Sequence, residues 1–298
     1  MARRKIVDAH HHLWDLGRGY HYAWLQDRPL PFGVCGELAP IATDYLLADF
    51  KADTAAYDLV KSVHIEAVSL HPEDETAWLQ KIADRDGFPH AIVARTELHL
   101  PGAEASLASH KQHRNLRGIR HIVNWHRDPR LTFTDRRDLL TDPAWRAGFS
   151  LLKKYDLSFD LQLYPSQMAD AADLAHRHPE TLIILNHTGM PVDRDAEGRA
   201  QWLSGMRRLA TQDNVVAKIS GLGMVDWHWN SESIRPFILE TIACFGIDRC
   251  MFGSNFPVDK LYGGFNALYA AFEHIVADFS EAEKQKLFHD NAVAHYRI

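Results

Sequence analysis

Three consecutive histidines stand close to the start of the chain. His10, His11 and His12 follow a short apolar, β-prone run that contains Ile6 and Val7. Successive side chains of a strand point to opposite faces, so His10 and His12 share one face and His11 lies on the other. Two imidazoles with this spacing at a strand end can bind one divalent metal ion or one anionic substrate. The alternative is an ordinary surface run of histidines.

Polar side chains recur at the ends of the later apolar segments. A strand packed between a barrel core and outer helices is expected to be apolar on both faces. Polar residues at so many strand ends therefore predict a polar, water-accessible mouth. Each of them alone could instead cap a carbonyl, pair with a carboxylate or hold a loop. They are His64 and Glu66, Arg120 and His121, Asp160, Gln162 and Tyr164, Asn186 and His187, Lys218 and Ser220, and Ser254 and Asn255.

Short apolar segments alternate with helical patterns along almost the whole chain. Because each crossover contains a helix, the strands are expected to be parallel. Eight such units in 298 residues predict a distorted (β/α)8 TIM barrel, one domain over 1–298, with its active site at the carboxyl ends of the strands. A doubly wound open sheet is the alternative, but no glycine-rich dinucleotide fingerprint follows the first strand. We expect the strands at 5–10, 60–67, 90–98, 116–123, 157–164, 181–187, 215–220 and 250–255.

A long segment without clear periodicity, from Asp15 to Pro40, follows the first strand. Loops of this length in compact domains are often functional. Its aromatic residues need a surface on which to pack. We therefore expect it to fold over the active site, with Trp24 among the substrate-binding residues.

Composition limits the classes of partner. The net charge of −6 argues against nucleic acid or an anionic membrane, and no apolar run approaches the length of a membrane span. The amino terminus lacks the apolar core of a signal peptide. Cys35, Cys244 and Cys250 form no metal or redox spacing and are expected to be reduced thiols of a cytoplasmic protein. The sequence is compatible with a homo-oligomer.

Five blocks in order resemble those of the amidohydrolase superfamily, and more narrowly its amidohydrolase-related TIM-barrel hydrolases. This group includes sugar lactonases and a 2-pyrone-4,6-dicarboxylate lactonase. The resemblance extends from the first strand to the terminal helix at His289–Ala292. The blocks are Asp8–Trp14, Gly118–Arg120, Leu185–Gly189, Lys218–Leu222 and Phe252–Pro257.

The resemblance implies roles for individual residues. His10 and His12 match the family's His-x-His on the first strand, and with His187 they form the expected metal ligands. The metal would be a single zinc or manganese ion, because the bridging lysine of binuclear relatives has no counterpart; a metal-free reaction is the alternative. The substrate-binding residues are expected to be Arg120, Tyr164, Gln162, Lys218 and Trp24.

Asn255 departs from the family pattern, which has an aspartate at this position of the eighth strand. That aspartate is the superfamily's usual general base, whereas a neutral amide cannot take up a proton but can ligate a metal or orient water. His187 or Glu66 could act as the base in its place, or a metal could lower the pKa of water. Loss of hydrolytic activity is the third possibility. Asp259 is a weak substitute, since it follows Pro257. The expected catalytic residues are thus His187, Asn255 and Glu66.

Three functions follow from these residues. The first is hydrolysis of a lactone or related cyclic ester or amide in a small carboxylated or polyhydroxylated substrate. The second is metal-dependent decarboxylation of an aromatic or unsaturated acid, which asks less of a base. The third is non-catalytic binding of a small acid or sugar.

Overall fold

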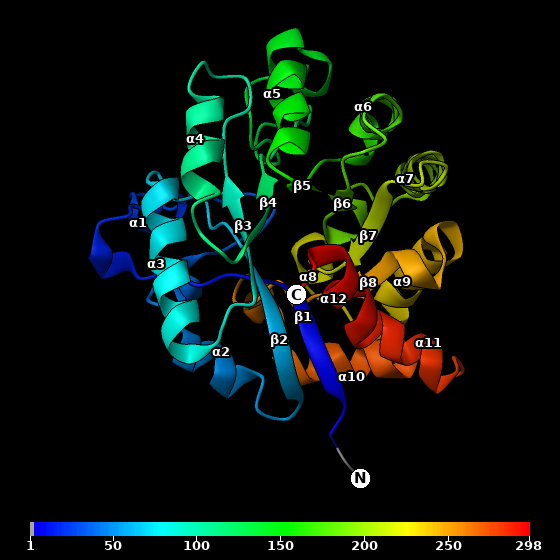
Figure 1. The fold of residues 1–298 in the computed structure, drawn as a ribbon. Helices are drawn as coiled ribbons and strands as arrows, with labels where there is room; N and C mark the ends of the chain where they lie inside the picture. Colours follow the sequence, from blue (N-terminus) through cyan, green and yellow to red (C-terminus); the bar gives the residue numbers. More distant parts are fainter. Residues whose placement is uncertain (1–2) are drawn as a thin grey trace.

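Eight parallel strands form the centre of the computed structural model, which describes residues 3–298. They pair in the order of the sequence, and helices surround them (Figure 1). Backbone hydrogen bonds from Asn255 N to His10 O and from His12 N to Phe256 O, both 2.7 Å, join the first strand to the segment after the last. The fold is therefore the predicted TIM barrel. The strands are β1 (Lys5–His11), β2 (Asp58–Ile65), β3 (Ala91–Arg95), β4 (Leu116–Arg120), β5 (Ser158–Leu161), β6 (Ile183–Leu185), β7 (Val215–Ile219) and β8 (Cys250–Phe252).

Helices follow most strands and cover the outside of the barrel. Asp142 accepts a hydrogen bond from Trp145 N and so caps α5, and Ser280 and Glu283 form a capping box at α11. The helices are α1 (Ala23–Gln26), α2 (Leu47–Asp53), α3 (Pro72–Asp86), α4 (Ala103–His110), α5 (Pro143–Lys154), α6 (Met168–Arg177), α7 (Ala196–Ala210), α8 (Leu222–Val225), α9 (Ser231–Phe245), α10 (Phe265–Ile275), α11 (Glu281–Gln285) and α12 (Asn291–Tyr296). None of these helices is long and apolar enough to cross a membrane.

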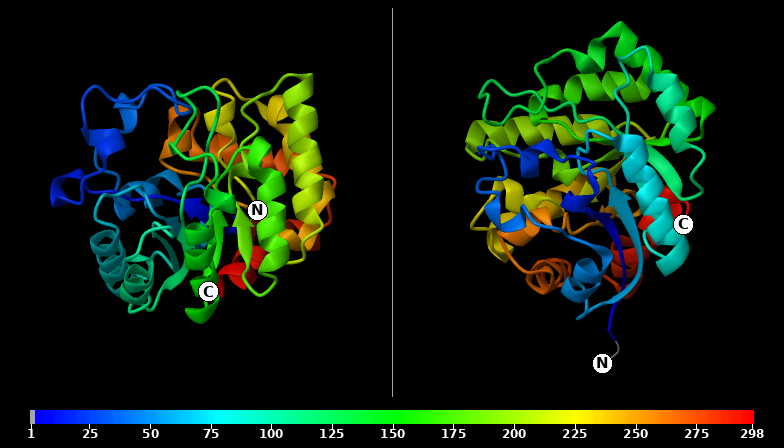
Figure 2. Two further views of the ribbon diagram at one scale, coloured as in Figure 1. Left: turned by 90° about the horizontal axis from the view of Figure 1, so that it is seen from above. Right: turned by 90° about the vertical axis from the view of Figure 1, so that its left-hand side faces the viewer.

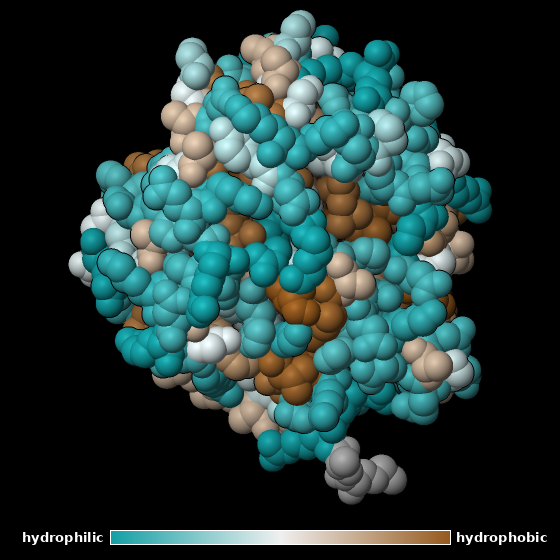
Figure 3. Space-filling model, viewed as in Figure 1, coloured by the Kyte–Doolittle hydropathy of each residue, from teal (hydrophilic) through white to brown (hydrophobic). Residues whose placement is uncertain are grey.

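The two ends of the barrel differ in what closes them. The carboxyl-terminal α12 lies at one end, where Asn291 donates to the carbonyl of Cys250 at the start of β8. Loops that include residues 15–40 lie at the opposite end (Figure 2). The face that carries the carboxyl terminus is largely hydrophilic with separate hydrophobic patches (Figure 3). Since α12 covers the end at which β8 begins, the carboxyl ends of the strands lie at the opposite end of the barrel, beside the loops (Figure 2).

Most strands are shorter than their apolar segments. β5 ends at Leu161 and β6 at Leu185, so Gln162, Tyr164 and His187 lie beyond the hydrogen-bonded ladder. These residues leave the ladder and begin the loops around the mouth. His187 and Asn255 both have positive φ, 54° and 59°, a left-handed conformation that is uncommon for residues other than glycine. Sharp turns directly after β6 and β8 thus set the direction of both side chains.

Candidate active site

A cavity of about 240 Å³ opens at the carboxyl ends of the strands. This volume is slightly below the range of ~300–1,000 Å³ found for drug-sized ligands, so the cavity suits a small molecule. Five polar side chains from the end of β4 and the segments after β1, β5, β6 and β8 line it: His12, Arg120, Gln162, His187 and Asn255. The cavity therefore combines residues that are far apart in the sequence.

Hydrogen bonds determine which atoms of His12 and Asn255 face each other. His12 Nδ1 lies 2.8 Å from the carbonyl of Ile65, so this nitrogen carries the proton and Nε2 has a free lone pair. Asn255 Nδ2 donates to Asp259 Oδ1 at 2.8 Å, which turns Oδ1 of the amide toward His12. His12 Nε2 and Asn255 Oδ1 are then two acceptors 3.3 Å apart. Two acceptors at this separation suit a shared water molecule or a cation.

His10 and His187 complete a group of three imidazoles with His12. The centroid of the His10 ring lies 4.4 Å from that of His187 and 5.0 Å from that of His12. His10 Nε2 is buried and has no hydrogen-bond partner among the described residues. Burial lowers the pKa of His12 to about 3 and the pKa of His10 and His187 well below the ordinary value. All three rings are thus neutral at pH 7 and can accept a proton or ligate a metal.

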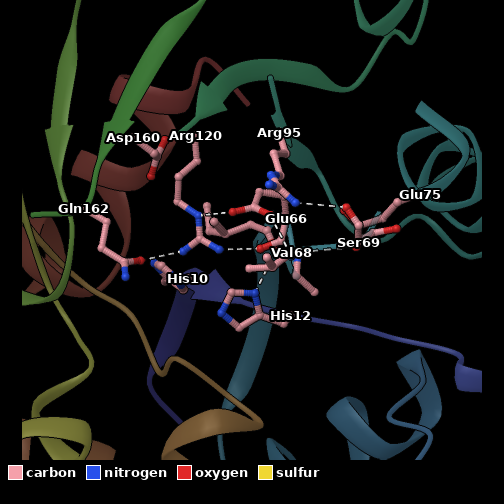
Figure 4. Close-up of polar contacts among 12 residues, drawn as sticks. His10, His12, Glu66, Val68, Ser69, Glu75, Arg95, Arg120, Asp160 and Gln162 are labelled. Carbon is pink, nitrogen blue, oxygen red and sulfur yellow. Dashed lines mark hydrogen bonds and ion pairs between the residues drawn. The ribbon is translucent and has the colours of Figure 1, made fainter. Parts of the chain in front are cut away.

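Arg120 links the strands on the far side of the cavity. Its Nε donates to Glu66 Oε1 at 2.5 Å, and one terminal nitrogen donates to Gln162 Oε1 at 2.9 Å (Figure 4). The other terminal nitrogen donates to the carbonyl of Glu66. Since the guanidinium has five N–H donors, two remain for a ligand. Glu66 Oε2 accepts from Val68 N at 2.7 Å, so both of its carboxylate oxygens are occupied.

Lys218 lies deeper in the barrel than the cavity. Its Nζ is 2.5 Å from Asp160 Oδ1 and 3.4 Å from His10 Nδ1, and its side chain is fully buried. Tyr296 of α12 donates to the same oxygen of Asp160 at 2.8 Å. Burial lowers the pKa of Lys218 to about 8, although Asp160 opposes the shift. This group closes the barrel below the histidines.

The sequence predictions for the site divide into residues that meet at the cavity and residues that do not. His12, Trp24, Arg120, Gln162, His187 and Asn255 line the cavity. His10 lies behind them, while Glu66 and Lys218 are held by hydrogen bonds to other residues outside the lining. Tyr164 donates its hydroxyl to the carbonyl of Leu131 and borders a neighbouring depression instead.

Two contributors were not predicted. Asp259 reaches Asn255 because the chain turns back after β8, with Asp259 N donating to Asn255 O at 3.1 Å. Its spacing of four residues from Asn255 was the signal, but Pro257 suggested that the loop leads away. Asp8 accepts from the backbone and hydroxyl of Ser254 and ties β1 to the end of β8.

A second set of potential metal ligands lies beside β3 and β4. Donor atoms of Glu97, His99 and His121 all lie within 4.8 Å of one another. However, His121 Nδ1 accepts from Trp145 Nε1 at 2.9 Å and from Leu98 N at 3.3 Å. His121 Nε2 therefore carries the proton and donates to Glu97 at 2.8 Å. These ligand types fit a divalent metal, but hydrogen bonds within the protein already use the nitrogen that would bind it.

The family model for amidohydrolases matches residues 7–298. The chain belongs to this family. As an amidohydrolase it is an enzyme of the superfamily that the sequence blocks indicated, and its substrate is a small molecule.

Three relatives are similar over nearly the full length of this amidohydrolase. An uncharacterized protein of Sinorhizobium fredii is 46% identical, with 100% of both chains covered. The L-fucono-1,5-lactonase of Burkholderia ambifaria is 27% identical, with 98% of this chain and 95% of the relative covered. The crystal structure of an amidohydrolase from Burkholderia multivorans with bound zinc is 26% identical, with a TM-score of 0.83, and covers 99% of this chain and 100% of the other.

Proposed function

We propose that this amidohydrolase hydrolyses a small lactone at the carboxyl ends of its strands. The observation that carries the proposal is the pair of acceptors His12 Nε2 and Asn255 Oδ1, 3.3 Å apart at the cavity. A water molecule that donates to both would be held for attack on a carbonyl carbon. Similarity to the Burkholderia L-fucono-1,5-lactonase supports a lactone as the class of substrate.

The neutral histidines supply the base that Asn255 cannot. His12 Nε2 faces the proposed water with its lone pair free, and His187 lines the same cavity. Either can accept the proton of water as the carbon–oxygen bond forms. Glu66 is the weaker candidate, because Arg120 and Val68 N occupy its carboxylate.

Arg120 is the proposed partner of the carbonyl oxygen. Its two unused N–H groups can donate to the oxygen as negative charge develops there, while Gln162 and Glu66 hold the guanidinium in place. A carboxylate or hydroxyl group on the lactone ring could bind Arg120 or Gln162 in the same way.

A divalent metal fits this set of residues. The free Nε2 of His12 has no hydrogen-bond donor of the protein beside it, which is what a metal ligand requires. His10 Nε2 also has no partner among the described residues, but Lys218 beside Nδ1 favours the proton on Nε2, so metal binding there requires that proton to move. We propose that His10, His12 and His187 would hold the ion, with Asn255 Oδ1 beside it. A histidine whose lone pair binds the ion cannot also accept a proton, so a bound ion is the alternative to a histidine base. Such an ion, zinc or manganese, would lower the pKa of water and polarise a carbonyl group.

The test is a panel of sugar lactones, pyrone dicarboxylates and alkyl-substituted δ-lactones, assayed with zinc or manganese supplied. Hydrolysis well above the buffer rate, lost in His187→Ala, is the expected result. The absence of any hydrolysis would contradict the proposal. Release of carbon dioxide from an aromatic or unsaturated acid would favour the decarboxylase that the sequence left as an alternative.

A further inference from the structure

The cavity has a polar floor and an apolar wall. The floor consists of the five polar side chains at the strand ends. The wall consists of side chains from the loops above, and we define it by its members that line the cavity: Pro31, Val34, Cys35, Leu38, Val68, Ile122, Phe133, Met224 and Val258. Burial raises the pKa of Cys35 to about 12, so its thiol is neutral and belongs with the apolar groups.

The polar side chains near the wall are occupied by the protein itself. Trp24 Nε1 donates to the carbonyl of Ala67 at 2.8 Å. The hydroxyl of Thr132 donates to the carbonyl of His126 and accepts from its N–H. Arg130 differs from these two residues: it pairs with Asp128 at 2.6 Å through Nε and one terminal nitrogen, and its side chain is 74% exposed to solvent. A ligand with several hydroxyl groups would therefore lose hydrogen bonds to water here, and each loss is costly in a buried site.

An adjoining depression, which shares Val34 and Met224 with the cavity, continues the apolar character of the wall. Phe32 and Trp227 line this depression and meet edge to face at a centroid distance of 5.7 Å, and Phe32 is 59% exposed. Phe133 lines the cavity and is 46% exposed. Exposed aromatic groups at a mouth are a common feature of sites that bind apolar ligands.

We propose that the preferred substrate is a lactone that carries an apolar substituent, alkyl or aryl, rather than a polyhydroxylated sugar lactone. This inference rests on the proposed function for the reaction, whereas the apolar wall is observed independently of that function. The lactone ring meets Arg120, His12 and Asn255 on the floor, and the substituent packs against the wall. Specificity is then set mainly by the loop after β1, which contributes Pro31, Val34, Cys35 and Leu38.

Hydrolysis of three lactones tests the preference. These are δ-octalactone, which carries a propyl group, unsubstituted δ-valerolactone and gluconolactone. Burial of apolar surface gives roughly 0.8 kcal/mol per methylene, or about fourfold, so we expect kcat/KM for δ-octalactone to exceed that for δ-valerolactone by about 10- to 50-fold. Equal values, or a preference for gluconolactone, would overturn the inference.

Binding of lactams separates this inference from the proposed function, because lactams resist hydrolysis. Calorimetry should give a dissociation constant for propyl-substituted δ-valerolactam about tenfold or more below that of the parent lactam. Tighter binding without hydrolysis of any lactone would support the apolar wall and contradict the proposed hydrolysis. Lactone hydrolysis with equal binding of the two lactams would support the proposed hydrolysis and contradict the apolar wall.

A matched pair of variants locates the effect. Val34→Thr keeps the shape of a wall residue but adds a hydroxyl, and it should reduce the propyl preference by about tenfold. Val293→Thr makes the same change in α12, outside the cavity lining, and should leave the preference unchanged. An unchanged preference in Val34→Thr, with the variant folded as judged by circular dichroism, would overturn the assignment of the wall.

Discussion

The side-chain amide of Asn255 donates a hydrogen bond of 2.8 Å to the buried carboxylate of Asp259. This contact settles which end of the amide faces the cavity, since the donor end is committed to Asp259. The chain thus retains a carboxylate next to the position where the family usually has one, but displaced by four residues and directed at the amide. Asp259 acts through Asn255 and does not line the cavity.

Asp259→Ala should therefore release the amide and lower kcat/KM for a lactone substrate by about 10- to 100-fold, as is typical of groups that hold a metal ligand in place by a hydrogen bond. Asp259→Asn is the matched control, because its carbonyl oxygen can still accept from Asn255. It should lose much less activity, although the acceptor for Gly223 N, 3.2 Å away, is replaced by an NH2 group and that hydrogen bond is lost. Equal losses in the two variants would argue against an orienting role.

Asn255→Asp, which restores the family residue, should destabilise this chain. It would bury two carboxylates in hydrogen-bond contact, and like charges so close cannot both ionise without cost. The backbone is not a complication, since aspartate tolerates positive φ about as well as asparagine. The exchange Asn255→Asp/Asp259→Asn should recover most of the lost stability in urea unfolding. A single variant as stable as the wild type would contradict this explanation of Asn255.

Lys218→Met tests whether Lys218 is a structural residue. Removing it leaves the buried charge of Asp160 without its partner, and we expect a loss of ~3–5 kcal/mol in the free energy of unfolding. Lys154→Met is a suitable control, because Lys154 forms an exposed ion pair with Glu104 and such pairs contribute about 0–1 kcal/mol. Full stability with weakened substrate binding would instead support the sequence prediction that Lys218 contacts the substrate.

Glu75 should make stability fall as pH rises. Burial raises the pKa of Glu75 to about 8, with the nearby charge of Glu66 adding to the shift. Between pH 4.5 and about 8 the unfolded chain loses this proton and the folded chain keeps it, so ionisation favours the unfolded state. Glu75→Gln retains an acceptor for Ala67 N and should reduce the fall in urea midpoint from pH 5 to pH 8. An unchanged decrease of the urea midpoint in the variant would show that Glu75 does not cause the loss of stability.

The order and type of the strands could be predicted because hydrophobic alternation and helix crossovers are local patterns. The depth at which each side chain lies within the barrel could not be predicted. Asp160 and Gln162 share a face of one segment, but Asp160 lies inside the ladder against Lys218 while Gln162 lies at the mouth. How far each strand extends decides which residue reaches the cavity, and pairing with neighbouring strands sets that length.

Local sequence patterns also gave wrong positions for some helix ends and did not predict some side-chain pairs. The sequence pattern predicts a helix from Asp44 to Leu59 with Asp44 as its N-cap, but the helix observed there is limited to Leu47–Asp53. Asp44 accepts from Leu16 N instead, and β2 already begins at Asp58. The pattern also predicts a helix from Ser233 to Phe245 with Pro236 in its first turn, whereas α9 begins at Ser231 and Pro236 lies inside it. The pairing of Glu66 with Arg120 joins residues 54 positions apart, and no local pattern predicts it.

The most direct test of the central claim is the rate of lactone hydrolysis by the wild type and by His12→Ala, with the metal content of both samples determined by elemental analysis. We expect hydrolysis far above the buffer rate for the wild type, and a loss of about 100-fold or more in the variant, in which the free Nε2 that faces Asn255 is absent. A decrease of bound metal in the variant would add His12 to the ligands. Wild-type activity at the buffer rate with zinc and manganese supplied, or an undiminished rate in His12→Ala, would contradict the proposed hydrolysis at the His12–Asn255 pair.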